Sequence, residues 1–305
     1  MVSARRHRRV VHKKKASLFS FAKLLILLLI PIALFLFVKL TTKNWNGEDK
    51  VSVVVQKETG NVDVVLFDPH LSEITTFVIP AETEISVARN LGTLKIKNVW
   101  QLGINENLGG DLLAETITKD FLFPTTLWLG EDQELGDMTF FKALRFVFLE
   151  KDTNIPFGDR VSISLFVLKA KSIERNSIDL GKSQFLNKAK LSDGSSGFRI
   201  PGEISQRLTF YFSDNDFSQK ETKIYIKDST GVFGSSERVG QILEVMGGKV
   251  VSLEKSSVEK MDCIIWGTDE KSVKKVSKLF SCQIKNTKGE FDIEMQIGSD
   301  FIKRF

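Results

Sequence analysis

The sequence predicts an α/β or α+β protein with two folded units behind a single N-terminal transmembrane helix. Three observations predict this class. A dense block of cations is followed at once by an apolar run that ends near Val38. Short β-branched strands then alternate with amphipathic helices between residues 51 and 150. From residue 222 to residue 297 the pattern becomes strand, helix, strand, strand, helix, strand.

The cations and the apolar run together indicate a membrane anchor. Seven cations stand in a stretch without Asp or Glu: Arg5, Arg6, Arg8, Arg9, Lys13, Lys14 and Lys15. A hydrocarbon core of about 30 Å needs about 20 mainly apolar helical residues, which this run supplies if Lys23 extends to the headgroups. Because cations stay on the cytoplasmic side, we expect residues 1–17 inside the cell, 18–40 across the membrane, and 41–305 outside.

A cleaved signal peptide is the competing interpretation, because the uncharged part between Lys23 and Lys39 is short. The residues that follow contain no Ala-x-Ala-like cleavage site, and Trp45 suits the outer interfacial belt of an anchored chain. The anchor is therefore the preferred interpretation. A secreted soluble module is the third interpretation. N-terminal sequencing of the mature chain would distinguish it from the anchored protein.

The composition limits the classes of partner and cofactor that we expect. The net charge is +5, and removing the seven tail cations leaves about −2 for the rest, so we expect a lipid bilayer and not a nucleic acid as a partner. The three histidines are His7, His12 and His70, and no metal-binding spacing is present, so we expect no metal and no cofactor. The two cysteines, Cys263 and Cys282, either pair outside the cell or stay as core residues.

The first predicted unit covers residues 51–203 and follows a linker at 41–50. Apolar periodicity predicts strands at 51–55, 62–67, 74–79 and 125–129, and helices from Gly109 to Pro124 and at 137–150. The turn Asp68-Pro69-His70 joins the second strand to the third. An alternating stretch at 161–168 predicts a further strand, and 192–197 is rich in turn residues and predicts a linker.

The order of motifs in this unit resembles the LytR-CpsA-Psr family. The resemblance is carried by Phe67-Asp68-Pro69, Ile79-Pro80-Ala81-Glu82-Thr83, Lys97-Asn98, Gly109-Gly110 and Phe123-Pro124, within residues 51 to 150. It implies the layered α/β shape of that family, whose members move a polyprenyl-pyrophosphate-linked glycan onto the cell wall.

Departures from the family pattern bear on activity. Ala81 stands where the family has an arginine that grips phosphate, and Glu82 replaces an aspartate. The family's upstream acid is missing near Gly60 and Asn61, although Asp63 lies close by. We therefore expect a binding or scaffolding relative without transferase activity. The candidate pocket residues are Asp63, Asp68, Glu82 and Arg89.

An active phosphotransferase is the alternative. It would join glycopolymers bound to polyprenyl pyrophosphate to peptidoglycan, with Mg²⁺ on Asp63 or Asp68 and with cations from Lys95, Lys97 or Arg160. This alternative requires several cations that converge on one apolar groove.

The second unit, 221–305, has the βαββαβ order of a ferredoxin-like domain. Strands are predicted at 222–226, 249–253, 262–266 and 291–297, and helices at 235–246 and 270–280. The unit resembles the LytR C-terminal domain in Ile226–Gly234, in Gly247 with Val250-Val251, and in Ile297–Phe301, with Asp228 where the family has asparagine. The resemblance implies an accessory module outside the cell, whose partner is wall glycan or another envelope protein.

Overall fold

The computed structural model describes residues 36–305 apart from residues 43, 46, 131–134, 170–173 and 202–206. The basic tail and most of the predicted transmembrane helix at 18–40 thus lie outside the described residues. Residues 36–41 are helical. Within the described part of the chain, none of the helices has the length and apolar character that crossing a bilayer requires.

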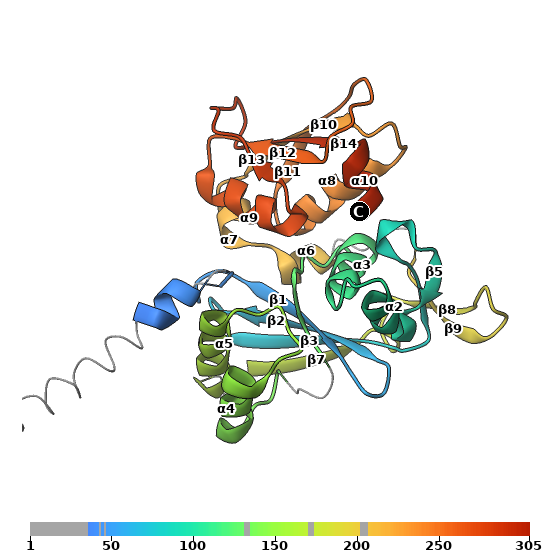
Figure 1. Ribbon diagram of the computed structural model, residues 1–305, viewed down its shortest axis with the longest axis vertical. Helices are drawn as coiled ribbons and strands as arrows, with labels where there is room; N and C mark the ends of the chain where they lie inside the picture. The colour runs from blue at the N-terminus through green and yellow to red at the C-terminus, as the bar shows by residue number, and fades with distance from the viewer. Residues whose placement is uncertain (1–35, 43, 46, 131–134, 170–173, 202–206) are drawn as a thin grey trace, which may run out of the picture.

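A five-stranded sheet in the order β6-β1-β2-β3-β7 forms the centre of the first unit (Figure 1). Its strands are β1 (Val51–Gln56), β2 (Val62–Asp68), β3 (Glu73–Ile79), β6 (Leu127–Leu129) and β7 (Arg175–Asp179). The first three form an antiparallel meander, and β6 and β7 add in parallel to β1 and β3. The turn after β2 is set by Asp68, whose carboxylate accepts hydrogen bonds from the N–H groups of His70 and Leu71.

Helices cover both faces of this sheet, because its strands are apolar on both sides. On β2, Val62, Val64 and Leu66 face α2 (Val99–Asn105) and α3 (Asp111–Phe121). Val65 and Phe67 face the other way, toward α4 (Phe140–Leu149) and α5 (Phe157–Lys169). Figure 1 shows these two helix pairs on opposite sides of the sheet.

Stacked aromatic rings fill the space over β3 on the α3 side. The Phe77 ring contacts those of Phe123, Tyr211 and Phe212 at 5.1 to 5.4 Å between centroids. Phe123 and Phe212 stack at 4.6 Å. Tyr211 and Phe212 belong to α6 (Arg207–Phe212), which follows the first unit, so the connecting segment closes that unit's core.

A small second sheet, in the order β5-β4-β9-β8, lies beside the first. It contains β4 (Thr83–Ser86), β5 (Thr93–Lys95), β8 (Asn187–Lys190) and β9 (Ser196–Arg199), with 3₁₀ turns η1 (Ala88–Asn90) and η2 (Ile96–Asn98). The stretch 192–197, predicted to be a linker, is instead the turn of the β8–β9 hairpin and the start of β9.

The strand predicted at 161–168 is wrong, because this stretch lies within helix α5. The side chains of Asp159, Ile163 and Val167 are buried at helical spacing, whereas Leu165 and Leu168 are exposed. Over so short a stretch, the sequence Val-Ser-Ile-Ser-Leu fits the two-residue period of a strand and also the 3.6-residue period of a helix. Packing of the apolar side chains against the sheet favours the helix.

The second unit is a five-stranded sheet in the order β11-β10-β14-β12-β13. Its strands are β10 (Lys223–Ser229), β11 (Lys249–Lys255), β12 (Cys263–Trp266), β13 (Gln283–Ile284) and β14 (Ile293–Gly298). The helices are α8 (Ser235–Val245), α9 (Glu270–Phe280) and the terminal α10 (Ser299–Arg304), preceded by α7 (Asn215–Gln219) between the units. Figure 1 places α8 and α9 between this sheet and the first unit.

The predicted βαββαβ element order is present, but the ferredoxin-like arrangement is wrong. A split βαβ unit leaves room for another strand between the two that flank its first helix. Here β10 and β11 pair directly and in parallel, and β14 pairs with the other edge of β10. The glycine pair after α8 ends that helix as expected, with Gly247 at φ +94°.

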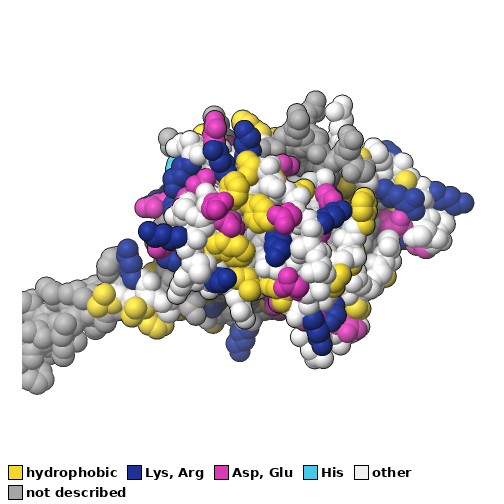
Figure 2. Space-filling model, turned by 90° about the horizontal axis from the view of Figure 1, so that it is seen from above, with side chains coloured by type: hydrophobic (Ala, Val, Ile, Leu, Met, Phe, Trp, Pro, Cys, Tyr) yellow, Lys and Arg dark blue, Asp and Glu magenta, His cyan; other side chains and the backbone are white. Residues whose placement is uncertain are grey.

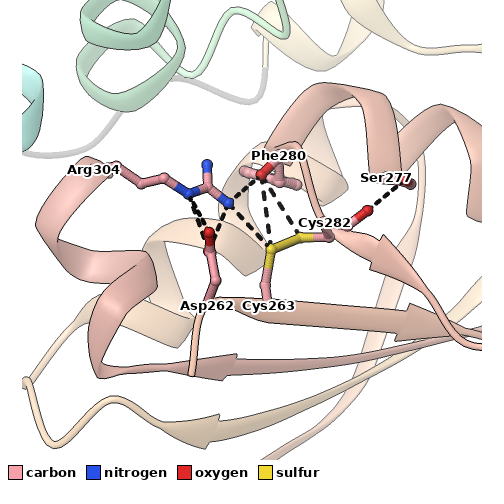
Figure 3. Close-up of a disulfide and its surroundings, with 6 residues drawn as sticks. All are labelled: Asp262, Cys263, Ser277, Phe280, Cys282 and Arg304. Carbon is pink, nitrogen blue, oxygen red and sulfur yellow. Dashed lines mark hydrogen bonds and ion pairs between the residues drawn. A yellow bond between two sulfur atoms is a disulfide. The ribbon is translucent and has the colours of Figure 1, made fainter. Parts of the chain in front are cut away.

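A disulfide between Cys263 and Cys282 joins the start of β12 to the segment after α9 (Figure 3). Arg304 covers it from α10: Nε donates to Asp262 Oδ2 at 2.9 Å, and Nη2 donates to Asp262 Oδ1 at 2.8 Å and to the Phe280 carbonyl at 2.6 Å. The pairing that the sequence left open is thus present. The contacts of Arg304 hold α10 against the segments that the disulfide joins.

Candidate functional site

The structure separates the two aspartates of the predicted pocket. Asp63 and Asp68 stand five residues apart on β2, so their side chains point to opposite faces of the sheet. Asp63 lies 3.7 Å from the Lys57 ammonium, and burial raises the pKa of its carboxyl. Asp68, at the other end of the strand, pairs with Lys50 at 3.0 Å. They cannot hold one Mg²⁺ ion together.

Glu82 lies at the centre of a surface ion-pair cluster. Lys95 Nζ is 2.7 Å from one of its oxygens, and Lys97 binds the other. These two ammonium groups hold the pKa of Glu82 below its usual range. Lys95 also reaches Asp193 at 2.9 Å. The two lysines therefore converge on carboxylates, Lys95 from the end of β5 and Lys97 from η2, and not on an apolar groove.

The turn that carries Ala81 is closed by its own neighbours. The Ala81 N–H donates to the Asn61 side-chain oxygen at 2.9 Å, which ties the end of β3 to the β1–β2 hairpin. A Cβ at Gly60 would stand 3.0 Å from the Lys97 Cβ and 3.3 Å from that of Ala81. The position where the family has its arginine thus presents a methyl group in a tightly packed turn.

The remaining predicted cations lie elsewhere. Arg89 is held by Glu115 of α3 through two hydrogen bonds of 2.7 Å, with its backbone at φ +60°. It lines a cleft of about 470 Å³ between the two units, opposite Arg304. Arg160 lies on α5, beyond the other face of the sheet, and donates to the carbonyl oxygens of Phe146 and Glu150. Asp63, Asp68, Glu82 and Arg89 therefore do not form one pocket.

The second unit presents a different candidate on the uncovered side of its sheet. Tyr225 on β10, Glu294 on β14 and Trp266 on β12 are register partners and form a straight row across three strands. Phe291 stacks on Tyr225 with the ring planes 8° apart. We call these four residues, with Glu254, the aromatic face. Figure 2 views the molecule from this side, where hydrophobic side chains lie among charges of both signs.

The polar atoms of the aromatic face are fixed by carboxylates. The Tyr225 hydroxyl donates to Glu254 at 2.5 Å, which raises the pKa of Tyr225 to about 12. The Trp266 indole N–H donates to Glu294 at 2.8 Å. Both rings are half-buried, and each has a neighbour on one face: Phe291 on Tyr225, and the Lys285 ammonium 5.7 Å from the centre of the Trp266 ring. Glu294 Oε1 also accepts the N–H groups of Glu290 and Phe291, so the lone pairs left for other donors are on Glu294 Oε2 and on Glu254. Such a surface can stack against an apolar ring face while accepting hydrogen bonds at its rim.

Sequence reasoning missed this face although a signal was present. In β10 and β12 the residues that alternate with buried Ile224, Ile226 and Ile265 include Tyr225 and Trp266. Aromatic residues at the strand positions that alternate with buried residues lie on the opposite face of the sheet, so they indicate a surface and not a core. The alignment of the two rings with Glu294 could not be predicted, because it depends on the strand order.

A trio of carboxylates near the junction of the units has the spacing of a metal site but is neutralised. Oxygens of Asp49, Asp214 and Asp216 lie within 4.8 Å of one another. Lys271 approaches Asp216 at 2.5 Å and Asp49 at 3.2 Å, and Lys275 binds Asp214. This network joins the entry to β1, the α6–α7 segment and α9.

Comparisons with known proteins find no matching family model and no matching curated protein. Solved structures do match. TagT of Bacillus subtilis is 13% identical, with a TM-score of 0.37 over 52% of this chain and 88% of that chain. TagV of B. subtilis is 12% identical, with 0.36 over 52% and 92%. The LytR-CPS2A-psr family protein YwtF (TagT), with a bound octaprenyl pyrophosphate lipid, is 14% identical, with 0.30 over 52% and 87%. These neighbours come from the family that the sequence resembles, and similarity this low assigns neither membership nor activity.

Proposed function

We propose that the chain is a membrane-anchored, extracytoplasmic binding protein of the cell envelope, and that it holds wall glycan on the aromatic face. The basic tail and apolar run support the anchor. The Cys263–Cys282 disulfide supports a location outside the cytosol, because disulfides persist in oxidising compartments.

The single observation that carries a binding role is the row of Tyr225, Glu294 and Trp266. Sugar rings have apolar C–H faces that stack on aromatic rings, and hydroxyls that donate to carboxylates. The face offers both, on neighbouring strands of one sheet, and a sugar stacked on Trp266 would either use the ring face opposite Lys285 or displace that ammonium.

The pairing of the predicted cations supports a binding role over a transferase. Phosphoryl and glycosyl-phosphate transfer need cations that are free to neutralise the developing charge. Arg89 is engaged by Glu115, and Lys95 and Lys97 by Glu82. The Ala81 N–H, which could otherwise donate to a phosphate, is engaged by the Asn61 side-chain oxygen.

The test is retention of the full-length, detergent-solubilised protein on purified, insoluble cell wall. Trp266→Ala should reduce the bound fraction several-fold, because it removes one of the stacking rings. Phe233→Ala is the matched control: Phe233 is 90% exposed in the same unit but lies in the loop before α8. Equal retention of the two variants contradicts glycan binding at the aromatic face.

The alternative is tested on the same preparation. With Mg²⁺ and a polyprenyl-pyrophosphate-linked glycan as donor, the binding proposal expects no glycan transfer to peptidoglycan. Transfer that is lost in a Lys95→Ala, Lys97→Ala double variant contradicts the proposed non-catalytic role.

A further inference from the structure

Helix α4 presents apolar side chains to solvent on most of its surface. Of its ten residues, only Lys142 and Arg145 are polar, while Ala143, Phe146 and Val147 are buried against the sheet. The remaining five are between 48% and 81% exposed: Phe140, Phe141, Leu144, Phe148 and Leu149. A helix that is mostly apolar is ordinarily buried, and among the residues that the structure describes nothing covers these five side chains.

Exposed apolar side chains are also present on α5, which packs against α4, and on the helical stretch at 36–41, which contacts α5. On α5, which packs against α4, Leu165 and Leu168 are exposed one helical turn apart. On the helical stretch at 36–41, Leu36, Phe37 and Leu40 are also exposed. We call the exposed residues of α4 and α5 the α4 patch. In Figure 1, α4, α5 and the stretch at 36–41 lie on the same side of the molecule.

The described end of the apolar N-terminal run is fixed to this side of the first unit by direct packing. The Phe37 ring contacts Phe157 of α5 at 5.4 Å, and Phe157 contacts Phe148 of α4 at 5.7 Å. A Cβ at Gly158 would stand 2.4 Å from the Thr42 nitrogen and 2.5 Å from the Val38 oxygen, so only glycine permits this approach.

Hydrogen bonds continue the attachment beyond the helical stretch. The buried carboxylate of Asp159 accepts the N–H groups of Asn44 at 2.9 Å and Trp45 at 3.4 Å. Trp45 is itself 2% exposed, with its ring against Phe67 and Phe166. The chain therefore passes from the apolar run into the folded unit through a rigid contact.

We propose that the outer leaflet of the bilayer covers the α4 patch, so that the first unit lies partly embedded beside its own anchor. This inference rests on the proposed anchor, and it adds a second, interfacial contact with lipid. The bilayer is the expected partner because of where the patch lies. The end of the apolar run, which would leave the membrane, packs against α5 beside the patch. Lys142 and Arg145 are exposed on the same helix and can extend to the phosphate groups of lipids.

The test places a probe on the patch in the full-length protein reconstituted into phosphatidylcholine–phosphatidylglycerol vesicles. Both native cysteines are in the disulfide, so Phe141→Cys supplies a single thiol for a nitroxide. Leu149→Cys is a second position, and Phe233→Cys is the exposed control on the other unit. Collision with oxygen and with a water-soluble nickel chelate is measured by electron paramagnetic resonance.

Labels at 141 and 149 should collide with oxygen in preference to the chelate, as lipid-embedded sites do, while the label at 233 behaves as in water. Vesicle flotation is measured on the same samples. Protein that floats but has water-accessible labels at 141 and 149 overturns this inference and leaves the anchor standing. Protein that does not float overturns both. Shielding of 141 and 149 from both reagents, with spin–spin broadening, overturns the inference in favour of a second copy.

Discussion

The charged residues proposed for the pocket are engaged by partners of opposite charge. Asp68, Glu82 and Arg89, which the sequence groups as pocket candidates, each have a local partner in Lys50, Lys95 or Glu115. The turn role of Asp68 could be predicted, because Asp before Pro stabilises such a turn within a few residues. Its separation from Asp63 also follows from the strand period of two, once both lie on one strand. The partners could not be predicted, since they come from distant segments.

Asp63 gives a prediction about pH. Burial raises the pKa of its carboxyl, and Lys57 opposes this only in part. The folded state therefore holds the proton more tightly than the unfolded state, so this residue lowers stability as pH rises from below about 3.8 through its folded pKa. Asp63→Asn should be more stable than the native protein at pH 7. The gain should shrink as pH falls and vanish below the unfolded pKa.

Denaturant unfolding of the full-length protein at a series of pH values measures this difference. Asp300→Asn is the control, because its carboxyl is paired with Lys303 on the surface. A gain for Asp63→Asn that is the same at all pH values would show that burial of the charge is not its source.

At the scale of elements, long apolar segments were predictable and short polar ones were not. The strands expected at 51–55, 62–67 and 74–79 correspond to β1, β2 and β3, and the helix expected at 270–280 is α9. The short strands β4, β5, β8 and β9 were not predicted, because they carry alternating polar residues and depend on each other for pairing. The strand order in the sheet of the second unit depends on long-range packing, which the local sequence pattern does not predict.

The disulfide should contribute to the stability of the second unit. Cys263 and Cys282 are 19 residues apart, and closing a loop of this size stabilises by about 3 kcal/mol in the chain-entropy model. A Cys263→Ala, Cys282→Ala variant should therefore unfold its second unit at lower denaturant. Hydrogen exchange measured by mass spectrometry in β12 and α9 follows that unit separately from the first.

Reduction of the native protein should reproduce the effect of the double variant, and the reductant should not shift the variant further. Unchanged unfolding of the second unit in both cases contradicts a stabilising role for the disulfide.

At the scale of the whole molecule, the two units share an interface that neither sequence pattern indicates. Arg238 on α8 donates to the carbonyl oxygens of Lys119 at 2.7 Å and Asp120 at 3.1 Å. These carbonyls end α3 and have no partners within that helix. The second unit thus caps a helix of the first. In the sequence, Arg238 is one of 43 lysines and arginines, and its place on an amphipathic helix does not mark it as a contact between the units.

Arg238→Met should weaken this interface by about 1 to 3 kcal/mol, because it removes two charge-assisted hydrogen bonds to partly buried carbonyl oxygens. Hydrogen exchange measured by mass spectrometry should become faster in the last turn of α3 and in α8, with little change in β2. Arg199→Met is the matched control, since Arg199 forms an exposed pair with Glu84 worth at most about 1 kcal/mol. Faster exchange throughout both units would instead indicate general unfolding.

The close approach at Gly158 has a consequence for how far the protein extends. Where a flexible tether precedes a domain, the domain sweeps a hemisphere whose radius grows with tether length. Here Val38 and Thr42 pack closely against α5 before β1 begins. An anchored molecule would therefore keep a constant distance from the membrane and a constant orientation, and it would reach ligands only by lateral diffusion. Its ligands would have to come within the span of the folded body itself.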